Sequence, residues 1–219
     1  MEKNTNETKS YNIIGDVAGR YNELMLLLEK MPKDAEVILL GDLNDRGPDS
    51  DKVIQWAIDN NIRCVKSNHG DMLVDHYNAA ITGDTSDLYS NMYTHLHNGG
   101  HETLCSYGGI ENVPPEHIEW LETRPYYIME NGLFLSHAPW HPLKELEEVT
   151  HNRDRGLTWN RLPPDRRDGL YQVHGHNTYK EVYKDELGDF GRCIDNSGEE
   201  ELTGFHFPSM EEFTQPYLD

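Results

Sequence analysis

The sequence has few cysteines and no long apolar segment. Cys64, Cys105 and Cys193 are odd in number, far apart and outside any C-x-x-C pair. This argues against a disulfide framework or a zinc–thiolate site and fits a reducing compartment. The polar first ten residues lack the apolar stretch of a secretory signal, and no apolar run approaches the roughly 20 residues that span a bilayer. We therefore expect a cytoplasmic protein that has no membrane partner.

Basic side chains are also scarce. The chain has 19 Lys and Arg against 39 Asp and Glu, a net charge of −20, so it should repel nucleic acid as well as anionic membranes. Its 219 residues can bury one substantial core. We expect a polar N-terminal segment over 1–10, one domain over 11–207 and a C-terminal tail over 208–219. The oligomeric state stays open.

Apolar runs alternate between strand and helix patterns in the first third of the chain. Strands are expected over Tyr11–Gly15, Val37–Leu40 and Ile62–Val65, and helices over Tyr21–Met31, Asp49–Asp59 and Met72–Ala79. This order predicts a parallel sheet covered by helices, which gathers ligands at the carboxyl ends of its strands. The fold class is therefore α/β.

The remaining two thirds mix helices and strands. Residues 80–125 are polar and rich in glycine, and we expect helices and loops that cover one end of a site. Further strands are expected over Tyr126–Met129, Leu133–Ser136, Gln172–His174, Arg192–Ile194 and Leu202–His206, with a polar segment over 141–170. Strands that follow the alternating first part indicate a second sheet packed on the first.

Two Gly-Asp pairs end the first two expected strands. They place Asp16 in G-D-V-A-G and Asp42 in G-D-L-N-D-R-G. Either aspartate alone could serve as a turn former. Neighbouring strands lie about 4.8 Å apart, however, so both carboxylates can reach one metal ion. In two-metal hydrolases the ions lie roughly 3.5–4 Å apart and a carboxylate can bridge them.

Amide and imidazole groups follow later strands. Asn68 and His69 lie in S-N-H-G, His137 ends L-F-L-S-H, and His176 ends V-H-G-H. A single histidine at a strand end is more often structural than a metal ligand. The repetition, together with an imidazole pKa near neutrality, indicates metal binding and proton transfer.

The three opening motifs resemble those of the calcineurin-like metallophosphoesterases, which are written G-D-x-H-G, G-D-x-x-D-R-G and G-N-H-E. The likeness is strongest to the phosphoprotein phosphatase branch and its small bacterial and bacteriophage-lambda-type serine/threonine phosphatases, with diadenosine tetraphosphatases as near cousins. The segments N-G-G-H-E-T-L-C-S-Y-G at 98–108 and I-D-N-S-G at 194–198 add to it. The resemblance implies a central β-sandwich of two sheets flanked by helices.

The resemblance also implies a role for each candidate residue. Metal ligands would be Asp16 at the first ion, Asp42 as the bridge, and Asn68, His137 and His176 at the second ion. His69 would be the general acid, with Asp45 as its partner. Arg46 and Arg161 would bind substrate phosphate.

The chain departs from the family pattern at three positions. Ala18 replaces a metal-binding histidine, and Ser67 and Gly70 replace Gly and Glu around Asn68-His69. Three outcomes are open for the first site: water fills the vacant position, His174 completes it, or the protein works with the second metal alone. Ligands rich in oxygen favour Mn²⁺, with Mg²⁺, Fe and Zn²⁺ as alternatives.

The resemblance leads us to expect a metal-dependent phosphoesterase. The expected substrate is a phosphoprotein or small phosphoester, and the first hypothesis is a serine/threonine protein phosphatase that uses in-line attack by metal-bound hydroxide. One alternative is hydrolysis of a diadenosine polyphosphate, in which Trp140 or Trp159 could stack on a base, although packing is the simpler role for both. The other is a phospho-ligand binding module with a degenerate first metal site.

Overall fold

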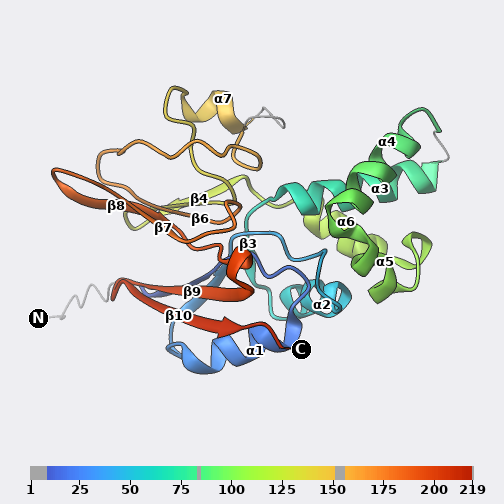
Figure 1. Ribbon diagram of the computed structural model, residues 1–219, viewed down its shortest axis with the longest axis horizontal. Helices are drawn as coiled ribbons and strands as arrows, with labels where there is room; N and C mark the ends of the chain where they lie inside the picture. Colours follow the sequence, from blue (N-terminus) through green and yellow to red (C-terminus); the bar gives the residue numbers. More distant parts are fainter. Residues whose placement is uncertain (1–8, 83–84, 151–155, 219) are drawn as a thin grey trace, which may run out of the picture.

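Two five-stranded sheets form the centre of the computed structural model, which describes residues 9–82, 85–150 and 156–218 (Figure 1). The first sheet has the order β10-β9-β1-β2-β3, and its strands are β1 (Tyr11–Ile14), β2 (Glu36–Leu39), β3 (Arg63–Cys64), β9 (Glu201–Phe207) and β10 (Glu211–Pro216). The second has the order β4-β5-β6-β8-β7, and its strands are β4 (Tyr127–Glu130), β5 (Leu133–Ser136), β6 (Tyr171–His174), β7 (Glu181–Asp185) and β8 (Gly188–Cys193).

Helices flank this pair of sheets. The α-helices are α1 (Tyr21–Lys30), α2 (Ser50–Asp59), α3 (Asn68–Thr82), α4 (Thr85–His95), α5 (His101–Tyr107), α6 (Pro115–Glu122) and α7 (Leu146–Thr150). Shorter turns are η1 (Leu96–Gly100), η2 (Ile110–Asn112) and η3 (Ser197–Glu199). In Figure 1, α1 lies under β9 and β10, whereas α3 to α6 form a separate group beside the sheets.

The alternation of side chains along the strands explains the layers. Ile13 of β1 and Ile38 of β2 point into a core between the two sheets, where they meet Leu135 of β5. Ile14 and Leu39, the next residues along each strand, point to the opposite face and join the core under the helices. Successive residues of a strand face opposite sides, so an apolar run buried on both faces produces a sandwich covered by helices.

The α/β class, the two sheets and the flanking helices are confirmed. The first sheet is mixed, however: β1, β2 and β3 are parallel, whereas β9 and β10 are antiparallel. Residues 211–216 were expected in a tail, which is wrong, because they form β10 and pair with β9. Strand β7 was not predicted because its mostly exposed residues carry a weak apolar pattern. Most of the expected N-terminal segment, residues 1–8, lies outside the described residues.

Among the described helices, none combines the length and the apolar character needed to cross a bilayer.

Candidate metal centre and active site

Backbone hydrogen bonds join the loops that follow β1 and β2. The Ala18 amide donates to the Asp42 carbonyl oxygen at 2.7 Å, and the Gly19 amide donates to that of Leu43 at 3.0 Å. A Cβ atom at Gly47 would lie 2.2 Å from the Ala18 carbonyl oxygen, so only glycine fits there. This contact holds Asp16 and Asp42 side by side at the ends of their parallel strands.

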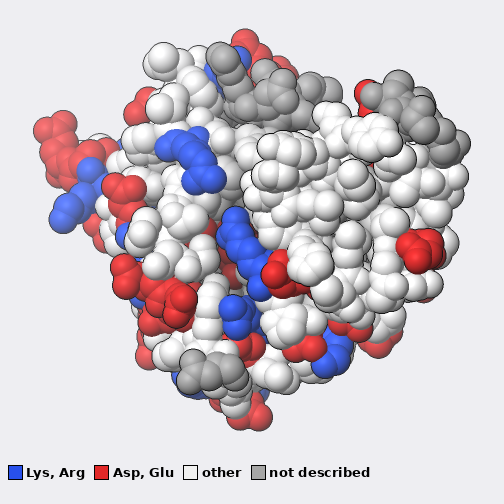
Figure 2. Space-filling view, turned by 45° about the vertical axis from the view of Figure 1, so that its right-hand side comes forward, with Lys and Arg blue, Asp and Glu red and all other residues white. Residues whose placement is uncertain are grey.

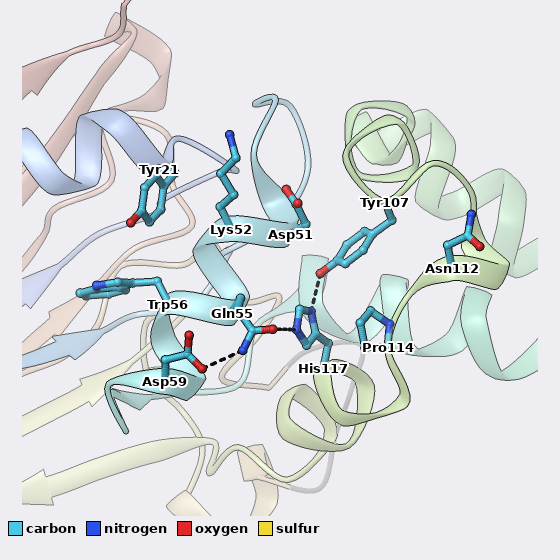
Figure 3. A pocket seen from close by; sticks show the side chains of 10 residues that line it. All are labelled: Tyr21, Asp51, Lys52, Gln55, Trp56, Asp59, Tyr107, Asn112, Pro114 and His117. Atoms are coloured by element: carbon cyan, nitrogen blue, oxygen red, sulfur yellow. Dashed lines mark hydrogen bonds between the residues drawn. The ribbon is translucent and has the colours of Figure 1, made fainter.

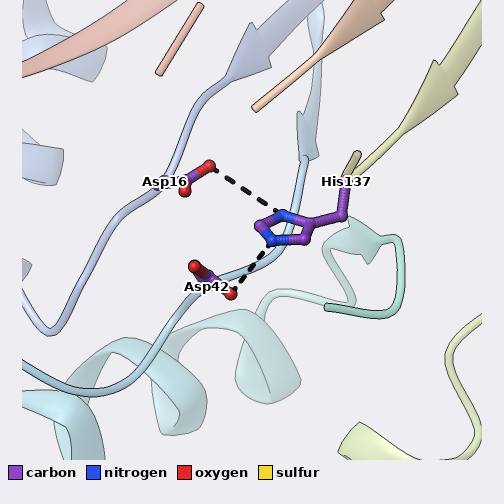
Figure 4. Close-up of side chains that lie close together, drawn as sticks. All are labelled: Asp16, Asp42 and His137. Carbon is purple, nitrogen blue, oxygen red and sulfur yellow. Dashed lines mark ion pairs between the residues drawn. The ribbon is translucent and has the colours of Figure 1, made fainter. Parts of the chain in front are cut away.

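His137, from the end of β5, faces both of these aspartates (Figure 4). Its Nδ1–H donates to the Leu40 carbonyl oxygen at 2.9 Å, which leaves the lone pair on Nε2 in the neutral ring. Nε2 lies 2.7 Å from Asn68 Oδ1 and 3.3 Å from Asp42 Oδ1. Burial lowers the pKa of His137, so three atoms with lone pairs converge on one point.

Asp16 and His176 complete this cluster. The His176 backbone amide donates to both carboxylate oxygens of Asp16 at 3.2 Å. The His176 ring lies 5.0 Å from that of His137, and its buried Nε2 has no hydrogen-bond partner among the described residues. Burial and the neighbouring carboxylates of Asp195 and Asp42 raise the pKa of Asp16. These buried acidic groups repel one another, and a cation would relieve that repulsion.

The donor set therefore fits a divalent metal ion. Ligand atoms of Asp16, Asp42 and His137 lie within 4.8 Å of one another. Asn68 Oδ1 lies beside His137 Nε2, and the His176 ring packs against that of His137. Carboxylate, amide oxygen and neutral imidazole are ligands of Mn²⁺, Fe and Zn²⁺, whereas Mg²⁺ takes mainly oxygen. All five predicted ligands come together in the structure.

A hydrogen-bonded chain of side chains lies behind His69. Its Nδ1 is 2.6 Å from Asp45 Oδ2, and His95 Nε2 is 2.9 Å from Asp45 Oδ1. Both rings donate, because the carboxylate can only accept. His95 Nδ1 is then free to accept from His76 Nδ1, 3.0 Å away. Sequence reasoning paired His69 with Asp45 but missed His95 and His76.

Further donors fix the Asp45 carboxylate. Thr103 Oγ1 donates to Oδ1 at 2.6 Å and Asn44 Nδ2 at 2.9 Å. Against the effect of burial, the hydrogen bonds from His69 and His95 lower the pKa of Asp45 to about 2. Burial favours neutral His69, but the carboxylates of Asp42 and Asp45 outweigh it and raise the His69 pKa. A proton is thereby held on a buried imidazole that faces the metal ligands. Thr103 lies in the motif at 98–108, and that motif was the sequence feature that pointed to the residues around Asp45.

The two predicted phosphate-binding arginines border the same cluster. Arg46 Nη2 lies 3.1 Å from His69 Nε2, and the Arg46 amide donates to the Gly99 carbonyl oxygen at 3.0 Å. A Cβ atom on Gly99 would lie 2.8 Å from Arg46 Cγ. Arg161 Nη1 donates to the carbonyl oxygen of His176 at 3.1 Å. Both guanidinium groups therefore contact a residue of the site.

Several residues of these loops adopt left-handed backbone conformations. The φ angles are 49° at Ala18, 43° at Asp42, 72° at Asp45 and 64° at Arg46. Each such residue costs on the order of 1–3 kcal/mol, and strain of this kind gathers at functional sites. Asp42 and Asp45 tolerate it best, since aspartate hydrogen-bonds locally in this region.

Ala18 lies where the family carries a histidine. Of the three outcomes expected for this first metal site, the structure excludes its completion by His174. His174 is not the replacement, because its Nδ1 donates to the Gly175 carbonyl oxygen at 2.8 Å and its Nε2 faces the Tyr183 hydroxyl at 3.1 Å. Burial lowers its pKa to about 4. Asp16 and Asp42 thus face the first position without an imidazole from residue 18 or 174.

The two tryptophans differ in placement. Trp140 is buried in a small cluster with Phe134 and Leu157, and Arg167 lies 4.4 Å over its ring. Trp159 is half-buried and meets the His176 ring edge-on at 6.0 Å. Packing therefore accounts for Trp140, whereas Trp159 lies beside the metal cluster.

A separate hollow of about 450 Å³ lies between α2 and the α5–α6 region (Figure 3). There the Tyr107 hydroxyl is 2.8 Å from His117 Nδ1, and His117 Nε2 is 2.9 Å from Gln55 Oε1. Since Nε2 must donate to the amide oxygen, Nδ1 accepts from the tyrosine. The described residues that line this hollow include no predicted site residue.

Comparison with known proteins agrees with this geometry. Residues 11–187 match the model of the calcineurin-like phosphoesterase family. The symmetrical bis(5'-nucleosyl)-tetraphosphatase of Buchnera aphidicola is 28% identical over 90% of this chain and 73% of its own length. The asymmetrical bis(5'-nucleosyl)-tetraphosphatase of Bacillus subtilis is also 28% identical, over 94% of both chains.

Solved structures share the fold. A protein provisionally assigned as a diadenosine tetraphosphatase superimposes with a TM-score of 0.68 and 17% identity, over 98% of this chain and 96% of its own. A serine/threonine protein phosphatase from Saccharomyces cerevisiae gives a TM-score of 0.60 and 14% identity, over 99% of this chain and 82% of its own. At this identity the likeness extends to the fold alone.

Proposed function

The chain belongs to the calcineurin-like phosphoesterase family and is a phosphoric ester hydrolase, and from this premise we propose that it cleaves the phosphoanhydride chain of a dinucleoside polyphosphate. The observation that carries the proposal is the similarity to a bis(5'-nucleosyl)-tetraphosphatase over 94% of both chains. A second relative of the same activity class matches over 90% of this chain.

Asp42, Asn68, His137 and His176 would hold a divalent metal ion, which would polarise a phosphoryl oxygen and make a nucleophile available at neutral pH. Asp16 extends the set toward Ala18. We propose Mn²⁺ as the ion, since the carboxylate and amide oxygens outnumber the imidazoles. These proposed ligands would form one complete site and one that lacks an imidazole.

The side chains around this centre bind the substrate and move its proton. Arg46 presents its guanidinium beside His69, where it can hold phosphate oxygens in a fork. His69 donates from Nδ1 to Asp45, and a proton taken up at Nε2 would pass to the oxygen that leaves phosphorus. The 3.1 Å separation of Arg46 Nη2 and His69 Nε2 places phosphate binding and proton donation side by side.

A serine/threonine protein phosphatase was the first expectation from the motifs, and it stays a prediction. What supports it is the motif resemblance and the shared fold with the yeast enzyme. The two readings differ in the bond broken, a phosphoanhydride in one and a phosphate monoester in the other. The same active-site groups serve both reactions.

Hydrolysis assays with added Mn²⁺ separate the readings. The native chain is offered diadenosine tetraphosphate and a phosphoserine peptide at equal concentrations, with His69→Ala as the matched inactive variant. We expect a kcat/KM at least tenfold higher for the tetraphosphate. Chromatography of the products then identifies the bond cleaved, since attack at the centre gives two diphosphates and attack at one end gives a tri- and a monophosphate. Higher kcat/KM on the peptide would reject the proposal and favour the phosphatase.

A further inference from the structure

A hollow of about 340 Å³ opens on the side of the metal cluster where the family histidine is missing. Its lining includes Ala18, Arg20, Arg46, Ser197 and Tyr217. Of the described residues that line it, two are arginines and none is Asp or Glu, although the chain carries a net charge of −20. Figure 2 shows Lys and Arg side chains gathered along the groove between the sheets and the helical group. The charged side chains that line this hollow are therefore basic, although the chain as a whole is acidic.

Three buried polar atoms belong to this lining. Arg20 Nε, Ser197 Oγ and the Tyr217 hydroxyl have no hydrogen-bond partner within the described part of the chain. All three can donate, and burial raises the pKa of Tyr217 to about 12, so its hydroxyl keeps its proton. Buried polar groups are normally paired, and unpaired donors beside guanidinium groups call for an acceptor with negative charge.

In the part of the chain that is described, carboxylates lie around the hollow but do not line it. Arg20 lies 4.3 Å over the Tyr217 ring and only 3.6 Å from Glu23 Oε1, which also accepts from the Leu218 amide. Behind the hollow, Asp195 accepts the backbone amides of Thr178 and Ser197 at 2.6 and 2.9 Å. None of these contacts involves the guanidinium of Arg46, which lines the hollow.

Arg46 connects this hollow to the reaction centre. Its Nη2 lies 3.1 Å from His69 Nε2, and its side chain also lines the hollow. Ala18 lines the hollow together with Arg46, and its left-handed φ of 49° turns the chain two residues after Asp16. A small methyl group at residue 18 keeps open the space that a larger side chain would take.

We propose that the Ala18-lined hollow is an anion-binding site, and that its ligand is the phosphate group next to the one attacked in a polyphosphate chain. Arg20 and Arg46 bind its oxygens, and the Ser197 and Tyr217 hydroxyls face its inner end. This inference rests on the proposed function, because a phosphate monoester has no second phosphate to place there. The loss of the family histidine thus enlarges the site for a longer anionic substrate.

Calorimetry with a diphosphate that cannot be hydrolysed tests the binding site directly. Methylenediphosphonate and orthophosphate are titrated into the full chain with saturating Mn²⁺, for the native protein, Arg20→Gln and Tyr217→Phe. We expect Arg20→Gln to weaken the diphosphonate about tenfold and Tyr217→Phe to weaken it a few-fold, with orthophosphate affinity unchanged. Arg166→Gln, which removes an exposed arginine paired with Asp185, is the matched control and should change neither.

Two results would overturn the inference. One is an unchanged affinity for the diphosphonate in both variants. The other is an equal loss for diphosphonate and orthophosphate, which would place Arg20 at the attacked phosphate. Tyr217→Phe removes a single oxygen atom, so it keeps the test decisive even where Arg20→Gln disturbs folding.

Kinetics separate this inference from the proposed function. With diadenosine tetraphosphate, Arg20→Gln should raise KM about tenfold, while kcat/KM for p-nitrophenyl phosphate stays within twofold of native. A native chain that does not hydrolyse the tetraphosphate at all would reject the proposed function. The calorimetric comparison would still decide whether the hollow binds a second phosphate.

Discussion

His69 Nδ1 lies 2.6 Å from Asp45 Oδ2, and both side chains are buried. The carboxylate is fully enclosed, and its other oxygen accepts from His95, Thr103 and Asn44. His69 is therefore held in one orientation and one tautomer, with Nε2 directed to Arg46 and the metal ligands. Proton transfer by a positioned side chain typically contributes about 10²–10⁴-fold to a rate.

The first prediction concerns Asp45→Asn. The amide keeps the shape of the side chain but removes the charge that favours protonated His69, so we expect kcat to fall about 100-fold. The loss should grow as the leaving group becomes more basic, because a poor leaving group depends most on the acid. Rates with phenyl phosphate and p-nitrophenyl phosphate measure this, and metal content should stay unchanged. An equal loss on both substrates would contradict the role of His69 as the acid.

His95 should act as a positioning residue. His95→Leu removes one donor to Asp45 and leaves its Oδ1 partly unsatisfied, so we expect kcat to fall about tenfold with little change in KM. His95→Gln retains an amide donor and should recover part of the rate. The pH profile of kcat should shift in His95→Leu, which a packing defect alone would not cause. Identical rates in the two variants would argue that His95 only fills space.

The sequence predicts the candidate metal ligands better than the side chains that position them. Asp16 and Asp42 follow neighbouring parallel strands of one sheet, so their meeting follows from its topology. His137 follows a strand of the second sheet, and the packing of the two sheets brings it to them. His95 and His76 lie on helices far along the chain, and no local pattern links them to Asp45. β10 was missed for a related reason: its mostly exposed residues acquire strand structure by pairing with β9. Long-range partners decide both cases.

Ser67 has a structural role that its motif position does not reveal. Its Oγ accepts from the Asp42 amide at 2.9 Å and from the Gly70 amide at 3.3 Å. Ser67→Ala leaves both buried donors without that partner, so the free energy of unfolding should fall by about 1–3 kcal/mol. Urea denaturation measures the change. Ser209→Ala, at an exposed turn where Ser209 Oγ contacts His206, should cost much less, and equal losses would contradict the role.

His76 makes stability depend on pH. Burial, and to a smaller extent the neighbouring His95, lower its pKa to about 4, against the usual value of about 6.5. Between these values the unfolded chain binds more protons than the folded one, so this contribution is present above pH 6.5 and lost as pH falls toward 4. At roughly 1.4 kcal/mol per pKa unit, the difference between pKa values of about 6.5 and about 4 is on the order of 3–4 kcal/mol. Unfolding curves of native and His76→Leu protein should therefore diverge across this window, and parallel curves would show that His76 does not titrate there.

Ala18→His tests the first metal position, which lacks an imidazole ligand from residue 18. The left-handed backbone at residue 18 suits histidine better than most residues, and a new imidazole would join Asp16 and Asp42. Changing only the hydrogen-bond partners of metal ligands alters metal affinity about 10–100-fold, so a restored ligand should tighten Mn²⁺ binding by at least that factor. Metal content after dialysis should rise toward two ions per chain. Ala18→Leu fills the same space without a ligand atom and should leave metal content unchanged. Two tightly bound ions in the native chain would mean that another group, such as the Asp195 carboxylate beside Asp16, already takes the place of the histidine.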